Sequence, residues 1–231
     1  MSDIAETIQQ NLAAVRRDIG EACDRAGRAA DQVRLVAVTK YAQWPWVEAL
    51  QQFHQVFGEN RPQQLAERRP LLPDVEWHLI GQLQRNKARL AVEHAAMIHS
   101  IDSVRLLERV SSVAADLPTA HRVPVLLQVN VSEEETKSGF SVAELQAAFA
   151  SLHDKPAVEI RGLMTMAPAT EDQTVIRKCF SGLRVLRDRL QDAHHVPLPE
   201  LSMGMSGDFP VAVEEGATLI RVGSRLYAGL T

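Results

Sequence analysis

Short apolar runs of strand length alternate with helical patterns along almost the whole chain. About eight such runs occur, at residues 35–38, 56–57, 77–80, 97–101, 123–131, 158–164, 200–203 and 218–222. Between them, apolar residues recur three or four positions apart, which is typical of amphipathic helices. Continuous apolar strands separated by helices indicate a parallel sheet whose faces are covered. The pattern therefore predicts an α/β fold.

The number of strand and helix units favours a closed barrel. Eight units in one chain predict a (β/α)₈ barrel, with helices expected at residues 3–25, 46–53, 84–92, 103–115, 141–152, 171–190 and 208–216. An open doubly wound sheet is the alternative, because runs 56–57 and 200–203 are weak and six firm strands would suit it. In both folds the active groups belong at the C-terminal ends of the strands. The residues expected at or just past such ends are Lys40, Asn60, His78, Asp102, Asn130, Met166, Ser206 and Gly223.

The composition is that of a globular protein without a strong charge bias. Of 231 residues, 25 are Lys or Arg and 29 are Asp or Glu, which gives a net charge of -4, so no global field draws the protein to nucleic acid or anionic lipid. No linker divides the chain, and we expect a single domain over residues 1–231. The two cysteines, Cys23 and Cys179, lack paired spacing, and the first residues lack an apolar signal core. These features predict a cytoplasmic protein without a disulfide framework.

Lys40 stands at the end of the first apolar run, 35–38. Side chains alternate along a strand, so Val36, Val38 and Lys40 share one face, and the lysine leaves from an apolar wall. Apolar surroundings disfavour a charged ammonium, and the neutral amine is the form that attacks an aldehyde. A single lysine at a strand end is more often a surface residue. A functional role for Lys40 therefore needs support from other residues.

Two late segments rich in glycine and hydroxyl groups supply that support, namely Ser202-Met203-Gly204-Met205-Ser206-Gly207 and Arg221-Val222-Gly223-Ser224. Backbone N–H groups and hydroxyls that converge at a helix N-terminus bind phosphate, and glycine lets a ligand approach the main chain. Each segment alone is also typical of an ordinary helix start or turn. In a closed barrel both would face the strand of Lys40, and together they predict a site for an aldehyde that carries a phosphate.

Several ordered motifs between about residues 34 and 229 resemble those of a known family. They are Ala37-Val38-Thr39-Lys40, Phe57-Gly58-Glu59-Asn60, Trp77-His78-Leu79-Ile80-Gly81-Gln82-Leu83-Gln84-Arg85-Asn86-Lys87, Thr136-Lys137-Ser138-Gly139-Phe140, Gly162-Leu163-Met164-Thr165-Met166, Leu201-Ser202-Met203-Gly204-Met205-Ser206 and Arg221-Val222-Gly223-Ser224. With these motifs the chain resembles the pyridoxal phosphate homeostasis proteins, which are single-domain relatives of the N-terminal barrel of alanine racemase. The resemblance implies the barrel of fold type III among proteins that use pyridoxal 5'-phosphate (PLP).

The resemblance also implies a role for each residue of the site. Lys40 would form the internal aldimine with PLP, and Arg221 would face the pyridine nitrogen. The phosphate would be held by Ser206, Gly223 and Ser224. Asn60 would contact the cofactor through water.

An arginine at the pyridine nitrogen limits the chemistry of the cofactor. Guanidinium is always a donor and cannot accept a proton from a pyridinium, so the ring nitrogen stays unprotonated and the ring is a poor electron sink. Racemisation and simple carriage of PLP are both compatible with an unprotonated ring nitrogen.

Related racemases append a β-domain that supplies a catalytic tyrosine, and we expect no such domain here. We expect Tyr227 to pack against the barrel. We therefore expect a monomeric carrier that serves PLP homeostasis or delivery to apo-enzymes, without turnover. A PLP-dependent amino-acid racemase is the alternative.

Three further features leave alternatives open. His78 is either a general base or, more simply, a hydrogen-bonded interior histidine. Lys137 follows Glu133-Glu134-Glu135 and belongs to a solvated charge run, unless it transiently captures or hands over the aldehyde. A barrel enzyme that uses a metal or a sugar phosphate would need carboxylates at the strand ends, and Asp102 is the main candidate. We therefore expect no metal site.

Overall fold

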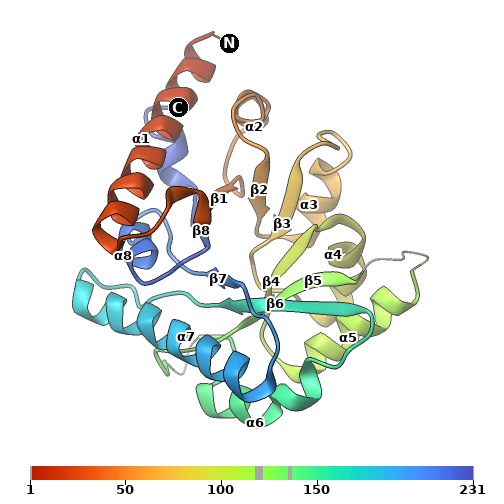
Figure 1. The fold of residues 1–231 in the computed structure, drawn as a ribbon. Helices are drawn as coiled ribbons and strands as arrows, with labels where there is room; N and C mark the ends of the chain where they lie inside the picture. The colour runs from red at the N-terminus through yellow and green to blue at the C-terminus, as the bar shows by residue number, and fades with distance from the viewer. Residues whose placement is uncertain (1, 118–121, 135–136, 231) are drawn as a thin grey trace.

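The computed structural model describes residues 2–117, 122–134 and 137–230, and these form a closed barrel of eight parallel strands (Figure 1). The strands are β1 Arg34–Val38, β2 Val56–Glu59, β3 Glu76–Leu79, β4 Met97–Ile101, β5 Val123–Gln128, β6 Val158–Met164, β7 Glu200–Ser202 and β8 Leu219–Val222. Each strand pairs with the next in chain order, and β8 returns to pair with β1, with Leu35 opposite Ile220. The predicted (β/α)₈ barrel is confirmed, and the open sheet is wrong.

Helices connect the strands and surround the barrel (Figure 1). They are α1 Ser2–Ala26, α2 Trp44–Leu50, α3 Pro62–Arg68, α4 Ala88–His94, α5 Val104–Ala115, α6 Val142–Leu152, α7 Gln173–His194 and α8 Phe209–Glu214, with 3₁₀ helices η1 Ala30–Gln32, η2 Arg85–Lys87 and η3 Ser224–Tyr227. The sequence did not predict α3, which is seven residues long and buries only Pro62 and Leu65. Two buried residues are too few to produce a helical apolar pattern. Among the described residues, no helix is both long and apolar enough to cross a membrane.

The core has two layers. Large apolar side chains such as Phe57, Trp77 and Phe180 fill the space between strands and helices and are fully buried. A smaller cluster inside the barrel contains Val36, Met97, Leu126, Met164 and Leu219. Val36 therefore points inward and its strand neighbours point outward, as the alternation along β1 predicted.

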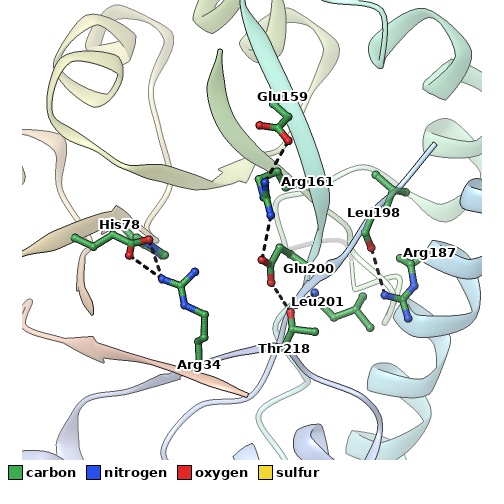
Figure 2. A network of polar contacts seen from close by, with 10 residues as sticks. Arg34, His78, Glu159, Arg161, Arg187, Leu198, Glu200, Leu201 and Thr218 are labelled. Carbon is green, nitrogen blue, oxygen red and sulfur yellow. Dashed lines mark hydrogen bonds and ion pairs between the residues drawn. The ribbon is translucent and has the colours of Figure 1, made fainter. Parts of the chain in front are cut away.

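The N-terminal end of the barrel carries a network of charged side chains (Figure 2). Arg161 bonds to Glu159 at 3.2 Å and lies 3.8 Å from Glu200 on the neighbouring strand. Glu200 also accepts a hydrogen bond from the Thr218 hydroxyl at 2.6 Å. These pairs tie together the starts of β6, β7 and β8, so the opposite end of the barrel is where the loops are available to form a site.

Candidate functional site

Lys40 lies two residues beyond the end of β1, at the C-terminal mouth of the barrel. The Thr39 N–H still bonds to the Gly58 carbonyl of β2 at 3.0 Å, so the ladder continues to the residue before the lysine. The lysine is half-buried, and its Nζ lies 4.9 Å from the centre of the Tyr41 ring, which is 86% exposed. The sheet thus holds the backbone next to Lys40, and within the described residues the amine contacts the exposed Tyr41 ring.

A buried ion pair beneath Lys40 holds the loop that carries it. The Glu59 carboxylate is fully buried at the end of β2 and accepts hydrogen bonds from the Thr39 hydroxyl and from Arg68 of α3. Arg68 also donates to the carbonyls of Thr39 at 2.8 Å and Ala42 at 3.1 Å. Burial raises the pKa of Glu59, and the bonds from Thr39 and Arg68 oppose that rise. The ion pair therefore holds the backbone before and after Lys40 in place, at Thr39 and Ala42.

The two glycine-rich segments lie side by side at the ends of β7 and β8. The Ser206 hydroxyl accepts a hydrogen bond from the Gly223 N–H at 3.3 Å, which joins them. Within the described part of the chain, the N–H groups of Ser206, Gly207 and Ser224 have no hydrogen-bond acceptor. Free N–H groups and hydroxyls that converge in this way form a concavity suited to an anion.

Two glycines are required for this arrangement. Gly204 has φ +93°, and a Cβ there would lie 2.6 Å from the Ala212 Cβ and 2.9 Å from the Phe209 Cα. This glycine lets α8 pack directly against the segment. A Cβ at Gly223 would lie 3.2 Å from the Val38 Cβ, so the end of β8 lies against the end of β1. The anion-binding groups and Lys40 therefore belong to one corner of the barrel.

Arg221 projects into the barrel from β8 and is only 4% exposed. Its Nη1 donates to the Ser202 hydroxyl at 2.6 Å, and its Nη2 donates to the Thr165 carbonyl at 2.9 Å. Burial lowers the pKa of Arg221 to about 10, and the nearby Asp208 carboxylate opposes that shift. At neutral pH the guanidinium remains a charged donor. Its two hydrogen-bond partners among the described residues are a hydroxyl and a carbonyl, which are both neutral, so the charged guanidinium can also bind a ligand.

All six residues predicted for the site line one cavity of about 480 Å³ at the barrel mouth. They are Lys40, Asn60, Ser206, Arg221, Gly223 and Ser224. The other walls are largely apolar and include Val38, Ile80 and Met166. An apolar cavity of this size with a few convergent polar groups is typical of a site for a small organic ligand. A second, more polar cavity of about 380 Å³ adjoins it and shares Lys40 and Asn60.

The structure places two other strand-end candidates away from this cavity. Asp102 accepts a hydrogen bond from the Ser103 hydroxyl at 3.1 Å, and Asn130 donates to the Glu134 carbonyl at 2.8 Å. Neither lines the cavity. In the part of the chain that the structure describes, no cluster of His, Cys, Asp and Glu could hold a metal ion.

The expectation that His78 lies at a strand end is wrong. It is the third residue of β3, is fully buried, and contacts Glu76 and His99 through its two ring nitrogens, each at 2.9 Å. This fits an interior histidine, because neither nitrogen is free for a ligand. His99 was not predicted as a polar interior residue, because it lies within the mainly apolar strand 97–101.

Lys137 forms an ion pair and does not line the cavity of Lys40. Its Nζ lies 2.7 Å from the Glu134 carboxylate and 3.3 Å from the Ser132 hydroxyl. Two neighbours named in the sequence patterns, Glu135 and Thr136, lie outside the described residues. A role for Lys137 in handing over an aldehyde stays a prediction.

Two aromatic residues line the cavity although the sequence analysis did not assign them to it. Tyr227 stacks on Trp46 at 5.7 Å between ring centres, so its expected packing role is real, yet both rings also border the cavity. The Tyr227 hydroxyl is buried and has no hydrogen-bond partner among the residues that the structure describes, and burial raises its pKa. Tyr227 lies in η3, three residues after Ser224, and this short distance in sequence from a predicted phosphate-binding residue could have indicated that it lines the site.

Comparison with known proteins identifies the family. Residues 10–230 match the family model described as alanine racemase, N-terminal domain. The pyridoxal phosphate homeostasis protein of Aquifex aeolicus is 38% identical over 224 residues, which cover 94% of this chain and 96% of that protein. The Escherichia coli K12 protein of the same name is 34% identical and covers 98% and 97%.

Solved structures agree with this assignment. PipY of Synechococcus elongatus with PLP bound is 37% identical, covers 96% of this chain and 100% of that chain, and superposes with a TM-score of 0.83. An alanine racemase of Clostridium difficile has a TM-score of 0.76 at 12% identity, with 96% of this chain and 59% of that chain covered, and shares the fold. The chain therefore belongs to the pyridoxal phosphate homeostasis protein family, whose barrel is that of the alanine racemase N-terminal domain.

Proposed function

We propose that this protein binds PLP in the cavity of Lys40 and serves PLP homeostasis by holding and releasing the cofactor. One observation carries the proposal: an amine, an anion-binding corner and a buried guanidinium line the same cavity of about 480 Å³. An aldehyde, a phosphate and a pyridine nitrogen are the three groups of PLP that such residues would recognise. The names of the relatives and the PLP-bound structure of PipY support it.

Lys40 is the covalent anchor in this proposal. Its neutral amine attacks the aldehyde carbon, a C=N bond forms and one water molecule leaves, and hydrolysis reverses the step. The ion pair of Glu59 and Arg68 fixes the loop of Lys40, and the lysine lines the cavity. A lysine anchored at its backbone and mobile at its amine suits a bond that is made and broken repeatedly.

The phosphate is held where β7 and β8 end. The Ser206 and Ser224 hydroxyls and the N–H groups of Gly207 and Ser224 surround this corner, and the cavity includes Gly223. These groups are neutral donors, so they bind the dianion through hydrogen bonds and not through an ion pair. Binding of this kind is compatible with release.

Arg221 would donate to the ring nitrogen and leave the bound cofactor a poor electron sink, which suits both carriage and racemisation. Two other features of the cavity favour carriage over turnover. The Tyr227 hydroxyl is the described candidate for a second acid or base, but its raised pKa makes it a poor proton acceptor at neutral pH. The mouth is also open, because Met166 and Met205 are each more than a third exposed.

A racemase is the second candidate, since the fold and the arginine are shared with such enzymes. A transfer experiment separates the two. We expect the protein loaded with PLP to restore activity to an apo-enzyme that needs PLP, and Lys40→Ala to lose both loading and transfer. Substitution of an exposed lysine of α7, Lys178→Ala, should behave as wild type. Exchange of the α-hydrogen of any amino acid in D₂O, abolished by Lys40→Ala, would instead establish turnover.

A further inference from the structure

A chain of hydrogen bonds runs through the interior of the barrel from its N-terminal end to Arg221. Glu76 Oε1 lies 2.9 Å from His78 Nε2, and His78 Nδ1 lies 2.9 Å from His99 Nε2. His99 Nδ1 lies 2.8 Å from the Ser202 Oγ, which accepts from Arg221 Nη1 at 2.6 Å. The chain therefore joins β3, β4, β7 and β8 and ends at the proposed cofactor site.

The middle of this chain is sealed from solvent, and its two ends lie at the surface (Glu76) and at the cavity (Arg221). His78, His99 and Ser202 are fully buried, and Arg221 is 4% exposed. The Glu76 side chain is 40% exposed at the N-terminal end. Because the buried members have no access to water, each hydrogen must find its acceptor within the chain.

The exposed end fixes the direction of the first bonds. Glu76 accepts from Arg34 at 2.8 Å as well as from His78. These bonds, that of His78 foremost, lower the pKa of Glu76 to about 2. An ionised carboxylate only accepts, so His78 Nε2 carries the hydrogen. In a neutral ring, His78 Nδ1 is then an acceptor, and His99 Nε2 must be the donor to it.

The Arg221 end leads independently to the same direction. Guanidinium only donates, so the Ser202 Oγ accepts from it, and the serine hydrogen is directed to His99 Nδ1. His99 Nδ1 must therefore carry no hydrogen. Burial, together with the nearby positive charges of Arg221 and Arg34, lowers the pKa of His99 well below its usual range, so its ring is neutral. With Nδ1 bare, the single hydrogen of His99 resides on Nε2.

We propose that His99 and Ser202 are positioning residues for Arg221, and that both histidines are held as neutral Nε2–H tautomers so that every bond of the chain donates away from Arg221. In this arrangement the Ser202 Oγ is a dedicated acceptor for one guanidinium nitrogen. The Thr165 carbonyl holds the second at 2.9 Å. Because these two bonds fix Nη1 and Nη2, the Arg221 guanidinium has a single orientation relative to the cavity. The effect on cofactor binding rests on the proposed function, whereas the tautomers of the two histidines are independent of it.

The tautomers can be measured in the protein without PLP. Two-bond ¹H–¹⁵N correlation spectra distinguish protonated from bare nitrogens in each imidazole, and His78→Gln and His99→Gln assign the two rings. We expect Nε2–H and bare Nδ1 in both. An Nδ1–H tautomer or a charged ring at either position would overturn the proposal.

The positioning role is tested with Ser202→Ala, which removes the hydroxyl and keeps the backbone. We expect about tenfold weaker PLP binding, together with loss of the single His99 tautomer because its Nδ1 has lost its donor. Ser202→Thr, which keeps a hydroxyl, should restore both. The matched control is His54→Gln, a half-buried histidine bonded to the Leu35 carbonyl outside the chain, and it should change neither.

These outcomes separate the two proposals. If the wild-type protein fails to bind PLP, the proposed function is wrong, while the tautomer measurement still decides the inference. If PLP binds with unchanged affinity to Ser202→Ala, the positioning role is wrong, while the proposed function stands.

Discussion

At the scale of single residues, the ion pair of Glu59 and Arg68 is the most consequential buried charge near Lys40. The Arg68 side chain is 12% exposed and that of Glu59 is fully buried. We expect Arg68→Ala to lower the free energy of unfolding by about 3–5 kcal/mol, because it leaves a buried carboxylate without its partner. Urea denaturation measures this. The control is Arg89→Ala, whose exposed pair with Glu93 should contribute less than about 1 kcal/mol. Equal losses in both variants would contradict the argument.

Glu76 gives a pH dependence at the same scale. Its pKa in the folded protein is lowered from 4.5 to about 2, mainly by the hydrogen bond from His78, so its contribution to stability is present above pH 4.5 and is lost as the pH falls towards 2. Solvent screening reduces the effect, because the side chain is 40% exposed. We expect the stability difference between wild type and Glu76→Gln to shrink over this range. A difference that is independent of pH would exclude the Glu76 bond as a source of acid sensitivity.

At the scale of elements, the contact between α8 and the segment after β7 determines whether the anion-binding corner forms. Gly204→Ala would force a Cβ into contact with Phe209 and Ala212 at a positive φ. We expect this variant to lose both stability and PLP affinity. Gly20→Ala is the matched control, since α1 offers open space there, and it should stabilise the protein by about 0.5–1 kcal/mol. Normal PLP binding by a folded Gly204→Ala would contradict the role of this contact.

Elements with many buried residues could be predicted, and those with few could not. All five residues of β4 are buried, as are five of the seven residues of β6, and the predicted bounds 97–101 and 158–164 match these strands. Helix α3 was overlooked because it buries only Pro62 and Leu65, although it supplies Arg68 to the loop of Lys40. Residues 129–131 continue the apolar run of β5, but the strand ends at Gln128, and Val129 instead forms an isolated bridge with Phe140.

At the scale of the whole molecule, closure of the barrel brings the predicted site residues together. Lys40 and Ser224 are far apart in sequence, yet pairing of β1 with β8 places them in one cavity. Both residues lie in recognisable local motifs, so they could be predicted as site residues from the sequence. The chain of His78, His99 and Ser202 has no local motif, because its members come from three different strands and meet only inside the closed barrel. Sequence patterns of period two identify the face of a strand but not the partner across the interior.

In the proposed function, Lys40 is the reversible anchor for PLP. The most direct measurement is the visible absorbance spectrum of the protein after incubation with PLP, followed by borohydride reduction and peptide mapping. We expect a visible band of a protonated C=N bond, no such band in Lys40→Ala, and reduced cofactor on the peptide that contains Lys40. A band that persists in Lys40→Ala, or modification confined to another lysine, would contradict it.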